Sequence, residues 1–128
     1  MLRTAHRATK IGFSMEYVYR VEPTTSGALE VRAASYRYRL LDANEREILA
    51  YHWHPIGVSP ITYPHLHLSG RLAPLDLGPR EDPVRLGGMH LPTGGPVTLA
   101  DVVRLLITEF GVIPRRADWE QILAEVAR

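Results

Sequence analysis

Four of the six histidines in the sequence lie close together, as His52, His54, His65 and His67. They form two His-x-His pairs, and each pair sits in a segment whose apolar and polar residues alternate. Because residues i and i+2 of a strand share one face, both imidazoles of a pair should point to the same side. If the two segments lie side by side, the sequence predicts one surface that carries four imidazoles.

The neighbourhood expected for these histidines contains cations and no acids. No Asp or Glu occurs from Ile48 to Leu75, whereas Tyr63 lies between the two pairs and Arg37 and Arg39 lie on an adjacent segment. A two-metal magnesium site needs oxygen ligands, usually carboxylates, so it is not expected here. A surface of imidazole, guanidinium and phenol instead suits a phosphate-bearing ligand.

Imidazole donates and accepts protons near neutral pH, which is the chemistry that RNA cleavage requires. Attack by the 2′-hydroxyl needs a base, an acid and a cation that stabilises the charged phosphorane. The first hypothesis is therefore a metal-independent, ribonuclease-like centre that needs no cofactor. Its catalytic acid–base pair would be His65 and His67, supported by His52 and His54. Phosphate would be bound by Arg37, Arg39 and Tyr63.

Other interpretations of the same residues stay open. Zinc could be bound by His52, His54, His65 and His67, since sets of imidazoles alone do bind this metal. The histidines could also be half-exposed sheet residues satisfied by hydrogen bonds. A different class of function is a non-catalytic partner-binding or regulatory subunit that uses the last helix and the long loop. His90 could reach this cluster from the loop, but a position on the loop surface is favoured.

Alternation of residue types predicts antiparallel strands before and around the histidines. Tyr17, Tyr19 and Val21 alternate with polar residues, and Tyr36, Tyr38 and Leu40 do so in the next segment. The change of parity between them predicts a bulge near Ala34-Ser35. A turn over 23–27 would pair Val21 with Leu29, Tyr19 with Val31 and Arg20 with Glu30. A turn over 42–45 would pair Tyr36 with Tyr51 and Tyr38 with Leu49, and would set Arg37 beside Ala50 and diagonal to His52.

The rest of the chain divides into three parts. Residues 1–14 carry Arg3, Arg7 and Lys10 and predict a basic tail, or a wrongly assigned start if Met15 is the true initiator. Residues 70–97 are rich in Gly and Pro and predict a long loop, with at most a short strand at Val84-Arg85-Leu86. Residues 98–127 predict two amphipathic helices, the first capped by Thr98 and Asp101 and the second by Asp118.

Length and composition are consistent with one α+β domain over residues 1–128. Hydrophobic residues make up 45% and charged residues 23%, which is typical of a globular chain and not of a disordered one. The absence of cysteine excludes disulfides and thiol chemistry and fits a cytoplasmic location. No apolar run is long enough to cross a bilayer. The expected architecture is an antiparallel sheet of four or five strands with two C-terminal helices packed on one face.

Three motifs in this order resemble a known family. They are Tyr36-Arg37-Tyr38, then Tyr51-His52-Trp53-His54-Pro55, then Ile61-Thr62-Tyr63-Pro64-His65-Leu66-His67. Over residues 30–70 the chain resembles the TumE-type toxins of bacterial toxin–antitoxin modules. The resemblance implies a toxin that acts on RNA and is neutralised by a helix-turn-helix antitoxin. RNA, such an antitoxin and a second copy of the chain are accordingly the partners considered, and a membrane is not.

Overall fold

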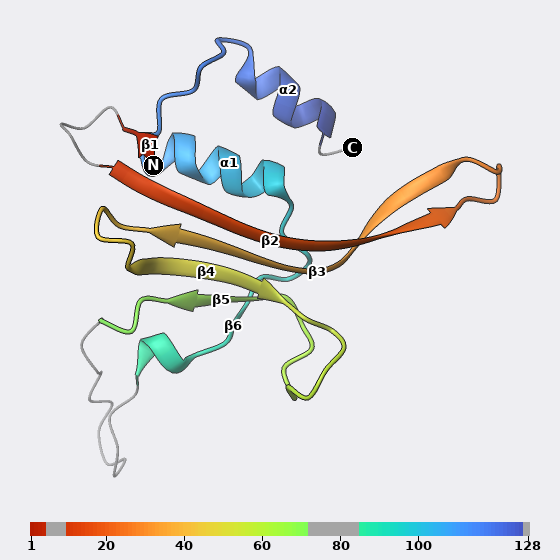
Figure 1. Ribbon diagram of the computed structural model, residues 1–128, viewed down its shortest axis with the longest axis horizontal. Helices are drawn as coiled ribbons and strands as arrows, with labels where there is room; N and C mark the ends of the chain where they lie inside the picture. Colours follow the sequence, from red (N-terminus) through yellow and green to blue (C-terminus); the bar gives the residue numbers. More distant parts are fainter. Residues whose placement is uncertain (5–9, 72–84, 127–128) are drawn as a thin grey trace.

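The computed structural model describes residues 1–4, 10–71 and 85–126 and has an α+β fold. Its described strands form one antiparallel sheet of six, in which each strand lies beside its neighbours in the chain (Figure 1). The strands are β1 (Leu2–Arg3), β2 (Lys10–Pro23), β3 (Leu29–Leu41), β4 (Glu47–Trp53), β5 (His65–Leu68) and β6 (Leu91–Pro92). The predicted α+β class is confirmed. The sheet has more strands than the four or five expected because a two-residue strand lies at each edge.

One face of the sheet forms the core together with helix α1 (Leu99–Thr108). Tyr36, Tyr38 and Leu40 alternate along β3 and are buried beneath Val102 and Leu106 of the helix. Because successive side chains of a strand point to opposite faces, the residues between them lie on the other side of the sheet. The alternation in the sequence therefore separates a hydrophobic face from a face that carries Arg37 and Arg39.

The ends of the two helices follow the residues expected to cap them. Thr98 and Asp101 form the predicted capping box, in which each side chain accepts a hydrogen bond from the other's backbone N–H. Helix α2 (Trp119–Val126) begins after Asp118, whose carbonyl accepts the N–H of Ile122. Among the described residues, the carboxylate of Asp118 accepts hydrogen bonds from Arg116 rather than from a backbone N–H of this helix.

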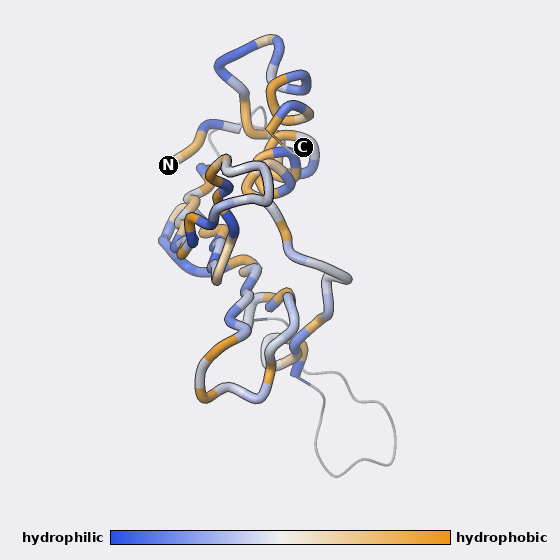
Figure 2. Tube along the Cα trace, turned by 90° about the vertical axis from the view of Figure 1, so that its right-hand side faces the viewer, coloured by the Kyte–Doolittle hydropathy of each residue, from blue (hydrophilic) through white to orange (hydrophobic). Residues whose placement is uncertain are grey.

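Helix α2 packs against α1, with Leu123 as its buried residue. An apolar pocket between the helices and the start of the chain is lined by Leu2, Phe13, Leu106 and Trp119, among others. Figures 1 and 2 show both helices at one end of the molecule and the segment that joins β4 to β5 toward the other. No helix of the described residues is long and apolar enough to cross a membrane.

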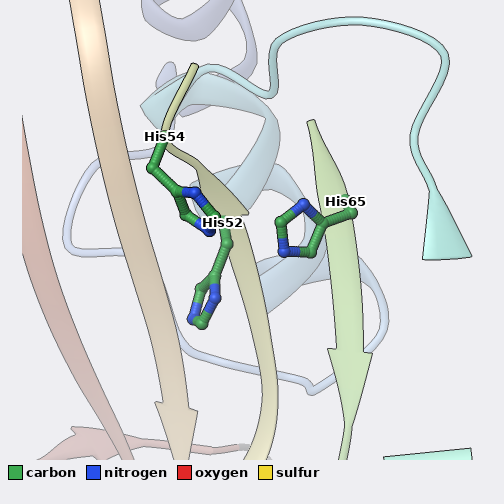
Figure 3. A group of neighbouring side chains, drawn as sticks. All are labelled: His52, His54 and His65. Carbon is green, nitrogen blue, oxygen red and sulfur yellow. The ribbon is translucent and has the colours of Figure 1, made fainter. Parts of the chain in front are cut away.

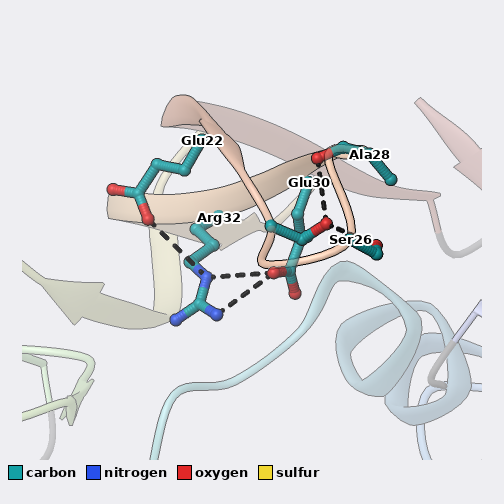
Figure 4. A network of polar contacts seen from close by, with 6 residues as sticks. Glu22, Ser26, Ala28, Glu30 and Arg32 are labelled. Atoms are coloured by element: carbon teal, nitrogen blue, oxygen red, sulfur yellow. Dashed lines mark hydrogen bonds and ion pairs between the residues drawn. The ribbon is translucent and has the colours of Figure 1, made fainter.

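The outer half of the β2–β3 hairpin extends beyond the rest of the sheet as a two-stranded arm, residues 18–34 (Figure 1). Its apolar side chains are exposed, including Tyr19, Val21, Leu29 and Val31. The arm begins at the predicted bulge: Val18 pairs with Ser35 and Tyr19 with Ala33, which leaves Ala34 as the additional residue. Its tip is held by polar contacts in which Arg32 lies between Glu22 and Glu30 (Figure 4).

The predicted strand pairings are wrong by two residues in both hairpins. Val21 pairs with Val31 and Arg20 with Arg32, because the turn extends to Ala28 and uses Gly27 at a φ of 81°. In the second hairpin Tyr38 pairs with Tyr51 and Tyr36 with Trp53. The turn extends to Arg46, and a bulge next to it leaves Ile48 as the additional residue, since Leu41 pairs with Glu47 and Leu40 with Leu49. A shift of two residues keeps every side chain on its predicted face.

Two assignments outside the hairpins also need correction. Residues 1–14 are not simply a basic tail, since Leu2–Arg3 forms β1 against Lys10 and Ile11 and the strand β2 starts at Lys10. In the expected loop 70–97, Leu86–Gly88 is a short 3-10 helix, η1, and Leu91–Pro92 is β6. The strand suggested at 84–86 is wrong at Leu86, and Val84 lies outside the described residues.

Candidate histidine centre

The register of the sheet sets the histidines in rows that run across the strands. Glu16 of β2 pairs with Arg37 of β3, Arg37 with His52 of β4, and His52 with His65 of β5. His67 pairs with Ala50 in the next row on the same face. Arg37 is therefore directly opposite His52, one step closer than the diagonal position expected from the sequence.

The four predicted imidazoles do converge on this face, opposite the face that packs on α1. Ring centroids are 5.6 Å apart for His52 and His65, 5.3 Å for His54 and His65, and 4.8 Å for His52 and His67. The rings of His65 and His67 are 4.9 Å apart. The surface of four imidazoles predicted from the two His-x-His pairs is confirmed.

His90 joins this group, although the sequence favoured a position on the loop surface. Its ring centroid is 5.0 Å from that of His65 and 4.6 Å from that of His67. The segment is placed by β6, which pairs Leu91 with Leu66 of β5. The hydroxyl of Tyr63 donates to the carbonyl of His90 at 3.4 Å. A two-residue strand that contains proline gives little signal in a sequence, so the position of His90 in the cluster was considered but not favoured.

His65 is the centre of the group and is only 1% exposed. Its Nδ1 lies 2.8 Å from the carbonyl oxygen of Tyr63. Because a carbonyl oxygen only accepts hydrogen bonds, Nδ1 must carry the proton, which leaves the lone pair on Nε2. That Nε2 atom is buried and has no hydrogen-bond partner among the described residues.

His52 resembles His65 in having a buried ring nitrogen. Its Nε2 atom is also buried without a hydrogen-bond partner in the described part of the chain. Burial, followed by the nearby His67, His65 and Arg37, lowers the pKa of His52 to about 4. The pKa values of His65 and His67 are also lowered, mainly by burial. These three imidazoles are therefore neutral at pH 7, which is the form that binds metal ions.

Carboxylates reach this face, contrary to the expectation of an acid-free surface. Arg37 forms an ion pair with Glu16 at 3.4 Å, and Arg39 forms one with Glu47 at 2.9 Å. Glu47 precedes the acid-free stretch by one residue, and Glu16 comes from a strand far away in the sequence. Both arginines predicted to bind phosphate are thus already paired, while Tyr63 stays partly exposed beside His65.

Two sets of three histidines have the spacing of a metal site. His52, His54 and His65 form the inner triad, shown in Figure 3, and His65, His67 and His90 form the outer triad. In each triad one ligand atom from every residue lies within 4.8 Å of the others. Nitrogens bound to a tetrahedral zinc ion lie roughly 3.3 Å apart, so small side-chain rotations would close either triad on an ion.

A pocket borders His52 and His54 of the inner triad. Its lining also includes Glu16, Arg37 and Trp53. Three imidazoles supply the ligand count of catalytic zinc centres, which keep the fourth tetrahedral position for water or substrate.

Comparisons with known proteins find no matching family model, no matching curated protein and no matching solved structure. The resemblance to TumE-type toxins therefore rests on the motifs in the sequence.

Proposed function

We propose that this protein binds a transition-metal ion, zinc in the first place, through the inner triad His52, His54 and His65. The observation that carries the proposal is the pair of buried Nε2 atoms, on His52 and His65, without hydrogen-bond partners in the described residues. A buried polar atom left without a partner costs about 1–3 kcal/mol. Coordination of one ion would satisfy both atoms at once and recruit the neighbouring His54.

The hydrogen bond of His65 supports the same proposal. Histidine ligands usually donate their second ring N–H to a backbone carbonyl or a carboxylate, which fixes the tautomer and orients the ring. The contact of Nδ1 with the Tyr63 carbonyl is of this kind and leaves Nε2 free to bind metal. A ligand set made of imidazoles suits zinc, copper and nickel, and does not suit magnesium or calcium.

The proposal is tested by metal binding to a chain purified without a polyhistidine tag and first stripped with a chelator. Zinc content is measured by elemental analysis, and Co²⁺ provides a visible absorption spectrum that reports the coordination. We expect tight binding by the wild type. The His54→Ala variant should bind the ion at least about 100-fold more weakly. Even the loss of a residue that only hydrogen-bonds to a metal ligand lowers metal affinity by up to about that factor, and His54 is a ligand itself.

Arg37→Gln is the matched control, because Arg37 lies next to His52 on the sheet but offers no lone pair. It should bind Co²⁺ as well as the wild type or slightly better, since a neighbouring positive charge is removed. His54→Ala is preferred to a change of the buried His65, which could disturb folding. A stripped wild type that takes up neither Zn²⁺ nor Co²⁺ would refute the proposal, as would unchanged binding by His54→Ala.

RNA cleavage without metal remains a second candidate, in line with the resemblance to toxins. The observation that favours it is a partly exposed set of groups beside His65 and His67, namely His54, His90 and Tyr63. In this candidate His65 and His67 act as acid and base, the partner is an antitoxin of the helix-turn-helix type, and the cytoplasm is the site of action. The buried position of His65 and the paired arginines count against it.

The two candidates differ in how they respond to a chelator. The test induces the wild type and a His65→Ala/His67→Ala variant in bacteria and scores growth and RNA integrity. It also incubates purified protein with RNA in excess EDTA. Cleavage that persists in EDTA and disappears in the double variant would support the second candidate. Intact RNA throughout would rule it out.

A further inference from the structure

The outer triad is more accessible than the inner one and shares His65 with it. His90 is exposed and His67 is half-buried, whereas His52 and His54 are both half-buried and His65 is buried. The ring of His67 also lies 4.8 Å from that of His52, so the two triads are in contact. An ion that arrives from solvent meets the exposed His90 of the outer triad before it meets the buried His65.

The shared histidine prevents the two triads from being occupied together. The Nδ1–H of His65 is held by the Tyr63 carbonyl at 2.8 Å, so only Nε2 has a lone pair to give. One lone pair binds one metal ion. Two ions held by three imidazoles each would both need that atom, so a chain binds a single ion at this centre.

The two triads differ in how many buried nitrogens they satisfy. Coordination through Nε2 in the inner triad would give a partner to the buried nitrogens of both His52 and His65, whereas the outer triad contains only one of them, that of His65. Leaving a buried nitrogen without a partner is unfavourable. The inner triad is therefore the resting position of the ion, and the outer triad is the weaker one.

We infer that the outer triad loads the inner triad: His67 and His90 capture the ion from solvent and pass it to His52 and His54 while His65 stays bound. This inference rests on the proposed metal-binding function. The transfer is a ligand exchange in which bonds from the ion to His67 and His90 break as bonds to His52 and His54 form. No electron is transferred, and two imidazole nitrogens on the ion are replaced by two others of the same kind.

A residue that binds the ion only during its transfer affects the rates of metal binding and release but not the equilibrium binding constant. Removing His90 should slow Co²⁺ binding and Co²⁺ release by the same factor, because one path serves both directions. His54 belongs to the resting position, so its removal should weaken the equilibrium binding itself. The two substitutions therefore separate a loading residue from a resting ligand.

The experiment follows Co²⁺ absorbance by stopped flow in the wild type, His90→Ala and His54→Ala, with stoichiometry from titration. We expect one ion per wild-type chain. In His90→Ala, association and release should both slow at least about tenfold. The Kd of this variant should stay within about threefold of the wild-type value, whereas His54→Ala should lose affinity.

The outcomes distinguish this inference from the function on which it rests. Two ions per chain, unchanged rates in His90→Ala, or an affinity loss in His90→Ala as large as that in His54→Ala would overturn the loading role while leaving metal binding intact. A wild type that binds no Co²⁺ would overturn both.

Discussion

At the scale of single residues, two tyrosines of β3 test how much a buried hydroxyl contributes to stability. The hydroxyl of Tyr36 accepts the N–H of Val97 at 2.7 Å, whereas the buried hydroxyl of Tyr38 has no partner among the described residues. Tyr36→Phe should lower the free energy of unfolding by about 1 kcal/mol, because the amide of Val97 loses its acceptor. Tyr38→Phe should leave it within about 0.5 kcal/mol of the wild type or raise it.

Urea unfolding of the two variants measures this difference directly, and the variants are matched in chemistry, strand and face. A larger loss in Tyr38→Phe than in Tyr36→Phe would contradict the assignment of the hydrogen bond.

The histidine centre predicts how stability depends on pH in the metal-free protein. The pKa of His52 falls from 6.5 to about 4 on folding, so between these values the unfolded chain holds a proton that the folded chain does not. Acid therefore favours unfolding over this range, and the lowered pKa values of His65 and His67 act in the same direction.

The midpoint of thermal unfolding, measured with a chelator present, should fall as the pH is lowered from 7.5 to 5. The fall should be smaller in His52→Gln, which keeps a polar side chain but does not titrate. A wild-type midpoint that stays constant or rises over this interval would show that the imidazoles are not held neutral by the fold.

Much of the site follows from residue spacing, but its electrostatics do not. The two His-x-His pairs were enough to predict one surface of four imidazoles, because alternation in strands is strict. The carboxylates of Glu16 and Glu47 were not foreseen, because a window along the sequence misses residues that neighbouring strands bring alongside. The same limit applies to His90, whose position depends on a two-residue strand.

At the scale of elements, the capping box of α1 can be tested against a threonine of the same helix. Thr98 accepts the N–H of Asp101, whereas Thr108 only donates its hydroxyl to the carbonyl of Arg104 on an exposed turn. Thr98→Ala should lower the free energy of unfolding by about 1 kcal/mol, because an N-terminal amide loses its partner. Thr108→Ala should change it by less than about 0.5 kcal/mol.

Equal effects of the two substitutions in chemical denaturation would mean that the cap is not what stabilises the start of α1.

The elements themselves were largely predictable, and the details of their pairing were not. The strands β2 to β5, the bulge at Ala34 and both helices agree with residue patterns. The first turn was predicted one residue too early, and the second was predicted without the bulge beside it. The length of a turn depends on local backbone geometry, such as that of Gly27 in the first turn. Because the resulting error was two residues in each hairpin, the predicted faces survived it.

At the scale of the whole molecule, β3 runs from the core into the exposed arm, and two leucines on it report the difference. Leu40 is 0% exposed beneath α1, whereas Leu29 near the tip is 75% exposed. Leu40→Ala should destabilise the protein by about 2–5 kcal/mol, because it leaves a cavity in the core. Leu29→Ala should change stability by less than about 0.5 kcal/mol.

Denaturant titration of this pair locates the core independently of the coordinates. A loss in Leu29→Ala comparable with that in Leu40→Ala would show that the arm is packed against something in solution.

Alternating patterns predict strands whether or not anything covers them, so the residue pattern does not indicate that the β2–β3 hairpin extends beyond the sheet. Burial depends on the length of α1 and on where it lies, and neither is encoded in the hairpin. At the start of the chain the error was the reverse: Leu2–Arg3 was predicted to be part of an unpaired tail, but it pairs with β2.

The arm also offers a practical route to the measurements proposed above. A polyhistidine tag would itself bind Zn²⁺ and Co²⁺ and would obscure the centre on β4 and β5. The turn at Thr24–Gly27 is exposed and lies at the far end of the arm from those strands (Figure 1). Exposed loop tips tolerate insertions well. A short affinity epitope or a fluorophore placed there would allow purification and immobilisation without introducing a competing chelator.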